Sequence, residues 1–305
     1  MLGLSLAMVI AVVIGLLVWK ATSNHGPGAE TTTPASDGVD RTVGLLREKD
    51  PVCDDWGKYA DELAENTKQW GEIDKGIPAS MWTPEQRQVV LTASEAMTAA
   101  ANEFERILPQ AQHVVLQELI AQAIVYWRAY VARIPDYVEL DGKLAGVAAN
   151  FGGAVTYMCS AIPLVPEIGG VEEGTSIAPH PAKLNPFMTD PDPACVGFLA
   201  VFDRQDSALR GWAAGDPTVP ASKWSAKEHR LNLAAREVLK RNVEEVRNIA
   251  EAAENPILAD LLLTYAAYVE AYANVIPDYS PDDDQLWKTS IFLAGGLSAA
   301  CKARP

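Results

Sequence analysis

The chain has 305 residues, a formal net charge of -15 at pH 7 and a hydrophobic content of 49%. This length and apolar content are enough for two domains with a core each, and they argue against a disordered chain. The acidity argues against a nucleic-acid partner, because no basic stripe exists that could release counterions from phosphates.

The chain begins with an uncharged apolar stretch, residues 2–19, which reads LGLSLAMVIAVVIGLLVW. It approaches the roughly 20 residues that a helix needs to cross a bilayer. We therefore expect residues 1–20 to form an uncleaved transmembrane anchor with Trp19 at the membrane interface. A cleaved signal peptide is the alternative, but the basic n-region and a small-residue cleavage site are both missing.

The side of the membrane on which the rest of the chain lies is indicated by two opposing signals. Lys20, just after the apolar stretch, weakly favours a cytoplasmic C-terminal portion. Four cysteines at matched positions favour an oxidising compartment instead. We expect a single-pass protein of the cytoplasmic membrane whose C-terminal part faces the extracytoplasmic side. Residues 21–49, rich in Thr, Pro, Gly and Ser without periodicity, predict a flexible stalk.

From residue 50 onward the sequence is written twice, with a constant shift of 142 positions. Ile134-Pro135-Asp136-Tyr137 returns as Ile276-Pro277-Asp278-Tyr279. The same shift superimposes further pairs: Asp50 and Asp192, Cys53 and Cys195, Trp70 and Trp212, Trp82 and Trp224, Tyr126 and Tyr268, Tyr130 and Tyr272, and Cys159 and Cys301. The repeat predicts module 1 (residues 50–160) and module 2 (residues 192–305), joined by a Pro/Gly-rich connector (residues 161–191) without regular structure. We call two residues equivalent when they lie 142 positions apart.

Apolar residues recur every three or four positions in four stretches of module 1, a spacing typical of the buried face of a helix. The predicted helices cover about residues 52–70, 84–108, 116–134 and 144–158. Thr83-Pro84-Glu85-Gln86 supplies a capping box with proline at the first helical position of the second. The third has the four-three rhythm of a bundle seam. The predicted fold class is all-α: an N-terminal transmembrane helix followed by two tandem repeated four-helix up-down bundles.

The repeated tetrapeptide and two glycine pairs have structural interpretations. Pro135 disfavours helical geometry at Ile134 and ends the third helix, while Asp136 or a neighbour caps the next one. Gly152-Gly153 and Gly295-Gly296, in the fourth helix of each module, let a neighbouring element approach closely.

Each module begins and ends with one cysteine, Cys53 with Cys159 and Cys195 with Cys301, at the same separation. The two ends of an even number of antiparallel helices lie at the same pole. A disulfide within each module is therefore favoured, and it would contribute about 4 to 5 kcal/mol by the loop-entropy estimate. The swapped pairing, Cys53 with Cys301 and Cys159 with Cys195, also respects the symmetry. Four free buried thiols are the remaining alternative.

No catalytic or metal-binding motif is recognisable. None of the four histidines lies in a Glu-x-x-His pair or recurs in the second module. Glycine-rich phosphate loops and the Gly-x-Ser-x-Gly motif are absent from the sequence. Asp136, Asp278 and the run Asp282-Asp283-Asp284 are explained by helix capping. We therefore expect a protein that is not an enzyme and has no catalytic residues, no metal site and no cofactor.

The repeated aromatic residues near loops are the candidate contact residues. Trp82 and Trp224 each precede a helix, and Tyr137 and Tyr279 follow the Pro-Asp turn. Packing against the helix ends is the simplest interpretation. The functional alternative is an apolar patch or groove that contacts a partner protein, a lipid or a glycan.

The order of LGLSLAMVIAVVIGLLVWK, a Thr/Pro stalk and two Ala-rich, cysteine-bounded helical modules resembles the single-span envelope proteins of actinobacteria, especially mycobacteria. The resemblance implies an outward-facing location and an envelope partner, and it assigns no functional residue. The predicted function is that of a membrane-anchored accessory or scaffold protein that docks on a membrane or cell-envelope complex. The alternative is a module that binds a lipid or another apolar envelope compound in a cavity lined by the glycine pairs and aromatics.

Overall fold

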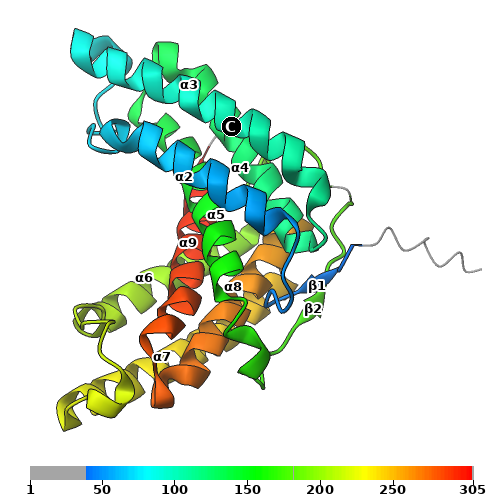
Figure 1. Cartoon of the computed structure of the whole chain (residues 1–305), viewed down its shortest axis with the longest axis vertical. Helices are drawn as coiled ribbons and strands as arrows, with labels where there is room; N and C mark the ends of the chain where they lie inside the picture. The colour runs from blue at the N-terminus through cyan, green and yellow to red at the C-terminus, as the bar shows by residue number, and fades with distance from the viewer. Residues whose placement is uncertain (1–38, 181, 304–305) are drawn as a thin grey trace, which may run out of the picture. The chain divides into compact units, whose positions relative to one another are not determined.

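The computed structural model describes residues 39–180 and 182–303. Over these residues the predicted all-α class is confirmed, and both modules have the same order of helices (Figure 1). Module 1 contains α2 (Val52–Gly71), α3 (Pro84–Ile107), α4 (Val114–Arg133) and α5 (Gly142–Ala161). Module 2 contains α6 (Pro193–Ala213), α7 (Ala226–Glu251), α8 (Pro256–Val275) and α9 (Asp284–Ala300).

The predicted transmembrane anchor lies outside the described residues. No helix within the described part of the chain combines the length and apolar content that crossing a membrane requires. Short 3-10 helices connect the α-helices: Ala79–Met81, Leu108–Gln110, Ile134–Asp136, Glu139–Asp141, Val165–Glu167, Ala221–Lys223, Ile276–Asp278 and Pro281–Asp283.

The α3 helix begins where its sequence signals place it. The Gln86 backbone N–H donates to the Thr83 hydroxyl oxygen (3.2 Å), and the Thr83 backbone N–H donates to the Gln86 side chain (3.0 Å). Ser225 and Glu228 make the same reciprocal pair at the start of α7. These boxes satisfy backbone donors that a helix start otherwise leaves unpaired.

The repeated tetrapeptide behaves differently from the prediction in two respects. Ile134 keeps right-handed helical geometry (φ -53°, ψ -41°), because the chain tightens from an α-helix into a 3-10 turn that accommodates Pro135. The cap of the following turn is Asp141, not Asp136: its carboxylate accepts from the Val138 N–H at 2.9 Å. The equivalent Asp283 accepts from the Ser280 N–H at 2.7 Å.

Two disulfides close the modules, Cys53–Cys159 and Cys195–Cys301, each across a sequence separation of 106. This is the favoured pairing within modules, not the swapped pairing or the free thiols. Each bond joins the start of the first helix of its module to the end of the fourth. The loop that it closes is long, so most of its stabilisation comes from constraining the unfolded chain.

A buried aspartate reinforces each disulfide-bonded pole. One carboxylate oxygen of Asp50 accepts from the backbone N–H groups of Gln112 and His113, at 2.8 and 2.9 Å. Asp192 does the same for the N–H groups of Glu254 and Asn255, at 3.0 and 2.8 Å. The first helix of each module is thereby tied to the loop before the third helix, and buried backbone donors are satisfied.

The two modules pack on each other through α5 and α9, which lie side by side (Figure 1). The helices are antiparallel, because Gly146 faces Ala299 at one end and Tyr157 stacks on Phe292 towards the other. Gly153 lies against the Phe292 ring, and the equivalent Gly295 lies against Asn150, the equivalent of Phe292. Reciprocal contacts of this kind define a pseudo-twofold axis between the modules.

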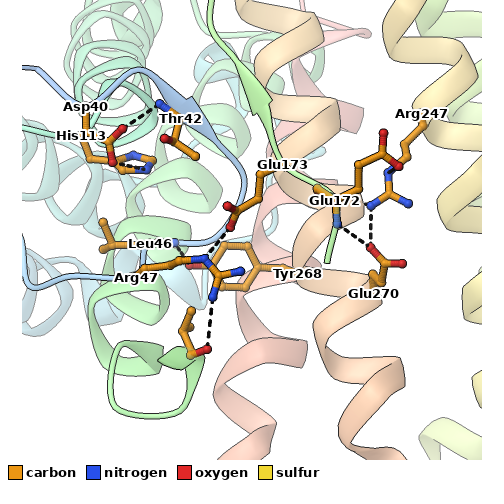
Figure 2. Close-up of polar contacts among 11 residues, drawn as sticks. Asp40, Thr42, Leu46, Arg47, His113, Glu172, Glu173, Arg247, Tyr268 and Glu270 are labelled. Atoms are coloured by element: carbon orange, nitrogen blue, oxygen red, sulfur yellow. Dashed lines mark hydrogen bonds and ion pairs between the residues drawn. The ribbon is translucent and has the colours of Figure 1, made fainter. Parts of the chain in front are cut away.

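Residues 39–49, predicted to be part of a flexible stalk, instead form an N-terminal strap on the folded body (Figure 2). Val43, Leu45 and Leu46 are buried. Strand β1 (Thr42–Val43) pairs antiparallel with β2 (Gly174–Thr175) of the connector. The Leu46 N–H donates to the Tyr268 hydroxyl of α8 at 3.2 Å, and Arg47 pairs with Glu173 at 2.8 Å. The prediction was wrong because it took the absence of a periodic pattern as a sign of flexibility. A strand as short as β1 is too short to show such a pattern.

Removal of the Cys195–Cys301 bond is expected to lower the free energy of unfolding by about 4 to 5 kcal/mol, the loop-entropy value for a separation of 106. The measurement is guanidinium unfolding of the full chain with both cysteines changed to Ser. The Cys53 and Cys159 double variant is expected to lose a similar amount, because its loop has the same length. Unfolding midpoints that do not change in either variant would contradict this estimate.

Gly296→Ala is expected to destabilise the chain by about 1 to 3 kcal/mol, because the added Cβ would overlap the buried Phe151 ring across the α5–α9 interface. Gly146→Ala in the same interface is the matched control. There the nearest atom is the Ala299 Cβ at 3.4 Å, so better helix propensity raises stability by up to about 1 kcal/mol. Urea unfolding of both variants checks the difference, and equal midpoints would show that the close approach is unimportant.

Candidate functional site

At one pole of each module, an aromatic stack joins the loop after the first helix to the loop after the third. Trp82 stacks on Tyr137 with ring centroids 5.4 Å apart, and Trp224 stacks on Tyr279 at 5.8 Å. The Tyr137 hydroxyl donates to the Lys75 carbonyl oxygen, and the Tyr279 hydroxyl to that of Pro217, both at 2.7 Å. The repeated aromatics therefore hold the two loops of each pole together.

Burial separates these four candidate contact residues into two groups. Trp82, Tyr137 and Tyr279 are buried, whereas Trp224 is half-buried. In module 1 the rings of Trp82 and Tyr137 hold the loops and leave little surface for a partner. In module 2, Trp224 and Tyr279 line an open groove, so the functional interpretation applies to this pair only.

The groove of module 2, which we call the aromatic groove, has a volume of about 270 Å³. Its floor is a continuous aromatic cluster: Trp212 meets the Trp287 ring edge-on at 5.1 Å, and Tyr272 lies 5.3 Å from Trp287. Two apolar side chains at the rim, Leu231 and Ile291, are 37% and 46% exposed. The lining comprises Trp212, Ala213, Gly215, Asp216, Pro217, Val219, Trp224, Glu228, Leu231, Asn232, Tyr272, Tyr279, Asp284, Trp287 and Ile291.

The charge of the aromatic groove is negative. Three of its lining residues, Asp216, Glu228 and Asp284, are carboxylates, and none is Lys or Arg. Hydrogen bonds from Thr218 lower the pKa of Asp216, and hydrogen bonds from Ser225 lower that of Glu228, so both are ionised at neutral pH. Burial, followed by the charges of Asp284, Asp283 and Asp216, raises the pKa of the Tyr279 hydroxyl. The rings are therefore neutral and surrounded by negative charge.

Sequence reasoning missed the residues that open this groove. Trp287 is equivalent to Ala145, and Asp284 to Gly142, so neither appears in the list of matched pairs. The sequence did contain a signal for them, namely a tryptophan and an acidic residue that occur in module 2 and have no counterpart in module 1. In module 1 the extra tryptophan, Trp127, comes from α4 and packs against Trp70 at 6.2 Å.

A second open cavity, of about 280 Å³, is lined by residues of the N-terminal strap, several of which are drawn in Figure 2, and by Gln112, His113 and Glu173. Arg47 pairs with Glu173 at 2.8 Å, and the His113 ring lies 3.9 Å from a carboxylate oxygen of Asp40. Burial lowers the pKa of His113, so that its ring is neutral at pH 7. This cavity therefore presents charges of both signs, whereas the charged residues that line the aromatic groove are all acids.

The third candidate is a pair of buried acids between the modules. Glu118 on α4 and the equivalent Asp260 on α8 are buried, with exposed fractions of 1% and 3%. The two side chains interact with each other, and because equivalent residues can meet only near the pseudo-twofold axis, the pair lies close to that axis. The Ser176 hydroxyl donates to the Asp260 carboxylate at 2.5 Å, whereas no donor reaches either oxygen of Glu118. Burial, and then the neighbouring Asp260, raises the pKa of Glu118 well above its usual value. A proton on Glu118 that points towards Asp260 gives the two carboxyl groups a hydrogen bond to each other. Because both residues are buried, a substrate has no access to the pair.

Two other kinds of site are a metal centre and a cavity lined by the glycine pairs. Between residues 39 and 303, with residue 181 left out, no three His, Cys, Asp or Glu side chains gather so as to hold a metal ion. The glycine pairs do not line a cavity: Gly153 and Gly296 are covered by the rings of Phe292 and Phe151. The alternative function, binding of a lipid or another apolar envelope compound in a cavity lined by these glycines, stays a prediction.

Comparisons with known proteins place the chain among mycobacterial proteins. A family model described as mycobacterial ESX-1 associated protein matches residues 34–305. An uncharacterized protein of Mycolicibacterium smegmatis (strain MKD8) is 27% identical over 320 residues, which cover 97% of this chain and 85% of that protein. No solved structure matches. The predicted resemblance to mycobacterial proteins is thereby confirmed.

The buried acid pair makes stability depend on pH. Below the unfolded pKa of about 4.5, Glu118 is protonated in both states; above it, the unfolded chain releases a proton that the folded chain keeps. The free energy of unfolding therefore falls by up to about 1.4 kcal/mol per pH unit as the pH rises towards the folded pKa. We expect Glu118→Gln to lose this decline between pH 5 and 8, measured by urea unfolding against wild type.

The matched control is Glu95→Gln, because Glu95 is exposed on α3. This variant is expected to keep the pH profile of the wild-type chain. If the wild type and Glu118→Gln have parallel profiles, then Glu118 is not protonated in the folded state.

Proposed function

We propose that this chain, which belongs to the mycobacterial ESX-1 associated protein family, is a non-enzymatic accessory protein that docks on a protein component of a secretion system. The observation that carries the proposal is the aromatic groove: it is open, it lies in one module only, and its rim exposes Leu231 and Ile291. Aromatic rings in a recessed patch with a polar rim are the usual anchors of protein interfaces.

The family description supports the secretion-system context. The matched region, residues 34–305, includes both modules, the connector and the N-terminal strap, so the family description applies to the whole folded body. The absence of recognisable catalytic motifs from the sequence supports a non-enzymatic role. The groove is smaller than most sites for small-molecule substrates, which favours the side chain of a partner as its occupant.

We also propose that residues 2–19 anchor the protein in the cytoplasmic membrane, with both modules on the extracytoplasmic side. The two disulfides support this orientation, because such bonds persist in oxidising compartments. Residue 39 already belongs to the folded body, so the tether between anchor and body is shorter than the predicted stalk.

A photocrosslinking amino acid at position 231 or 291 is expected to capture a secretion-system component in intact mycobacterial cells, because both positions lie on the groove rim. The measurement is mass spectrometric identification of the captured protein. Position 233 is the matched control: Leu233 lies on the same helix as Leu231, is 46% exposed, and does not line the groove.

Capture of one secretion-system component from positions 231 and 291, but not from 233, supports the proposal. Capture of the same proteins from all three positions, or capture only of proteins outside any secretion system, contradicts docking through this groove.

A further inference from the structure

The loops that follow α2 and α6 have the same backbone structure in both modules. The Gly76 N–H donates to the Asp74 carboxylate at 2.8 Å, and the equivalent Thr218 N–H donates to Asp216 at 2.9 Å. The Trp82 indole donates to the Ile77 carbonyl oxygen at 2.9 Å, and that of Trp224 to the Val219 carbonyl oxygen at 3.0 Å. The carbonyl oxygens of Lys75 and Pro217 accept from Tyr137 and Tyr279 at the same distance. Lys75 and Pro217 therefore occupy equivalent backbone positions.

In module 1 a lysine of the chain itself fills the aromatic site. The Lys75 ammonium lies 4.1 Å from the centroid of the Trp70 ring and donates to the carbonyl oxygens of Trp70 and Ile73 at 2.5 and 2.7 Å. Gly142 borders the site: a Cβ there would lie 2.9 Å from the Tyr137 hydroxyl oxygen and 3.7 Å, an ordinary contact distance, from the Lys75 Cβ. The aromatic ring and the two carbonyl oxygens at the end of a helix together hold one cation.

Module 2 keeps this arrangement but has lost the lysine. Trp212 replaces Trp70, the backbones of Trp212 and Gly215 replace those of Trp70 and Ile73, and Pro217 replaces Lys75. Asp284 stands in place of Gly142, which brings a carboxylate to the side of the groove that the lysine stem occupies in module 1. Trp287 adds a second indole to the cluster. The site thus has more aromatic surface and more negative charge than its copy, without its cation.

We propose that the aromatic groove of module 2 binds a lysine or arginine side chain from an extended segment of a partner protein. The cation lies over Trp212 and Trp287, donates to the carbonyl oxygens of Trp212 and Gly215, and meets the negative field of Asp216, Glu228 and Asp284. The exposed Leu231 and Ile291 contact the backbone and apolar neighbours of the inserted residue. This inference rests on the proposed docking function and adds the chemistry of the partner.

Lys288 does not fill this role. Its ammonium pairs with Asp284 at 2.9 Å, but it also lies 5.5 Å from the Tyr157 ring of module 1, and it does not line the groove. It pairs with neither Asp216 nor Glu228, whose hydrogen bonds come from Thr218 and Ser225. The indole of Trp212 donates to the Asn232 side chain at 2.7 Å, whereas the Trp70 indole donates to the Tyr130 hydroxyl, so a different partner holds the ring in module 2.

The test uses the full chain labelled with 5-fluorotryptophan, whose eight tryptophans give separate ¹⁹F resonances. The probes are acetyl-Gly-Lys-Gly-amide and the same peptide with norleucine, which has a similar stem and no charge. The lysine peptide is expected to shift the resonances of Trp212 and Trp287 and to bind about ten-fold more tightly than the norleucine peptide. Equal binding of the two peptides, or no shift of these two resonances with either, overturns the proposal.

The repeat supplies variants that exchange the two sites. Pro217→Lys gives module 2 the lysine of module 1 and is expected to weaken binding of the lysine peptide about ten-fold or more, because the new side chain occupies the groove. Pro217→Ala, which changes the backbone without adding a cation, is the matched control and should stay near wild type. Lys75→Ala is expected to make the Trp70 resonance respond to the lysine peptide. If Pro217→Lys and Pro217→Ala bind the peptide equally, the site does not select a cation.

The outcomes separate this inference from the proposed function. Capture of a secretion-system component from position 231, together with equal binding of the lysine and norleucine peptides, would leave docking standing and overturn the cation site. Selective binding of the lysine peptide without any such capture would leave the cation site standing and overturn the proposed docking.

Discussion

The structure depends on the close contact of two glycine-bearing helices, α5 and α9. Each helix buries its glycine face against a ring or an amide of the other, so the two modules meet over a surface that neither could cover alone. Because the contacts are reciprocal between equivalent residues, the interface is that of a symmetric dimer in which the two subunits have become one chain. The N-terminal strap contacts α4 of module 1 and α8 of module 2, with β1 paired to β2 of the connector and the Leu46 N–H donating to the Tyr268 hydroxyl, so it holds both modules.

Near the axis of this internal dimer lies a polar seam. Glu118 and Asp260 meet there, and Gln122 and the equivalent Thr264 are buried on the same two helices. A buried neutral acid beside a hydrogen-bonded carboxylate costs stability relative to an apolar pair. Such groups also penalise any other register, because a shift of either helix would leave them without partners. The seam therefore contributes to the specificity of the packing between the two modules more than to its stability.

The two copies have diverged where packing does not restrict them. The ion pair between Glu105 and Arg128 in module 1 reappears in module 2 as Arg247 with Glu270, with the charges exchanged (Figure 2). At the aromatic poles the loops are the same, yet one contains its own lysine and the other is open. A duplicated module offers this opportunity: one copy fills the site with its own side chain, and the other leaves the site exposed. Module 1 thus serves as an internal reference for module 2.

The sequence by itself determined the helices and the repeat, because both depend on local periodicity and on the 142-residue shift. It favoured a disulfide within each module but left the swapped pairing open, and the structure decided between them. It could also anticipate that Gly152-Gly153 admits a close neighbour, but not which one. Only the tertiary structure decided that this neighbour is α9, that residues 39–49 lie on the body, and that Tyr137 is buried while Trp224 borders a groove. The physical reason is that burial and charge pairing are set by groups far apart in the chain. Lys75 and Trp287 belong to no local sequence pattern. Their roles are recognised only when the aromatic sites of the two modules are compared in the structure.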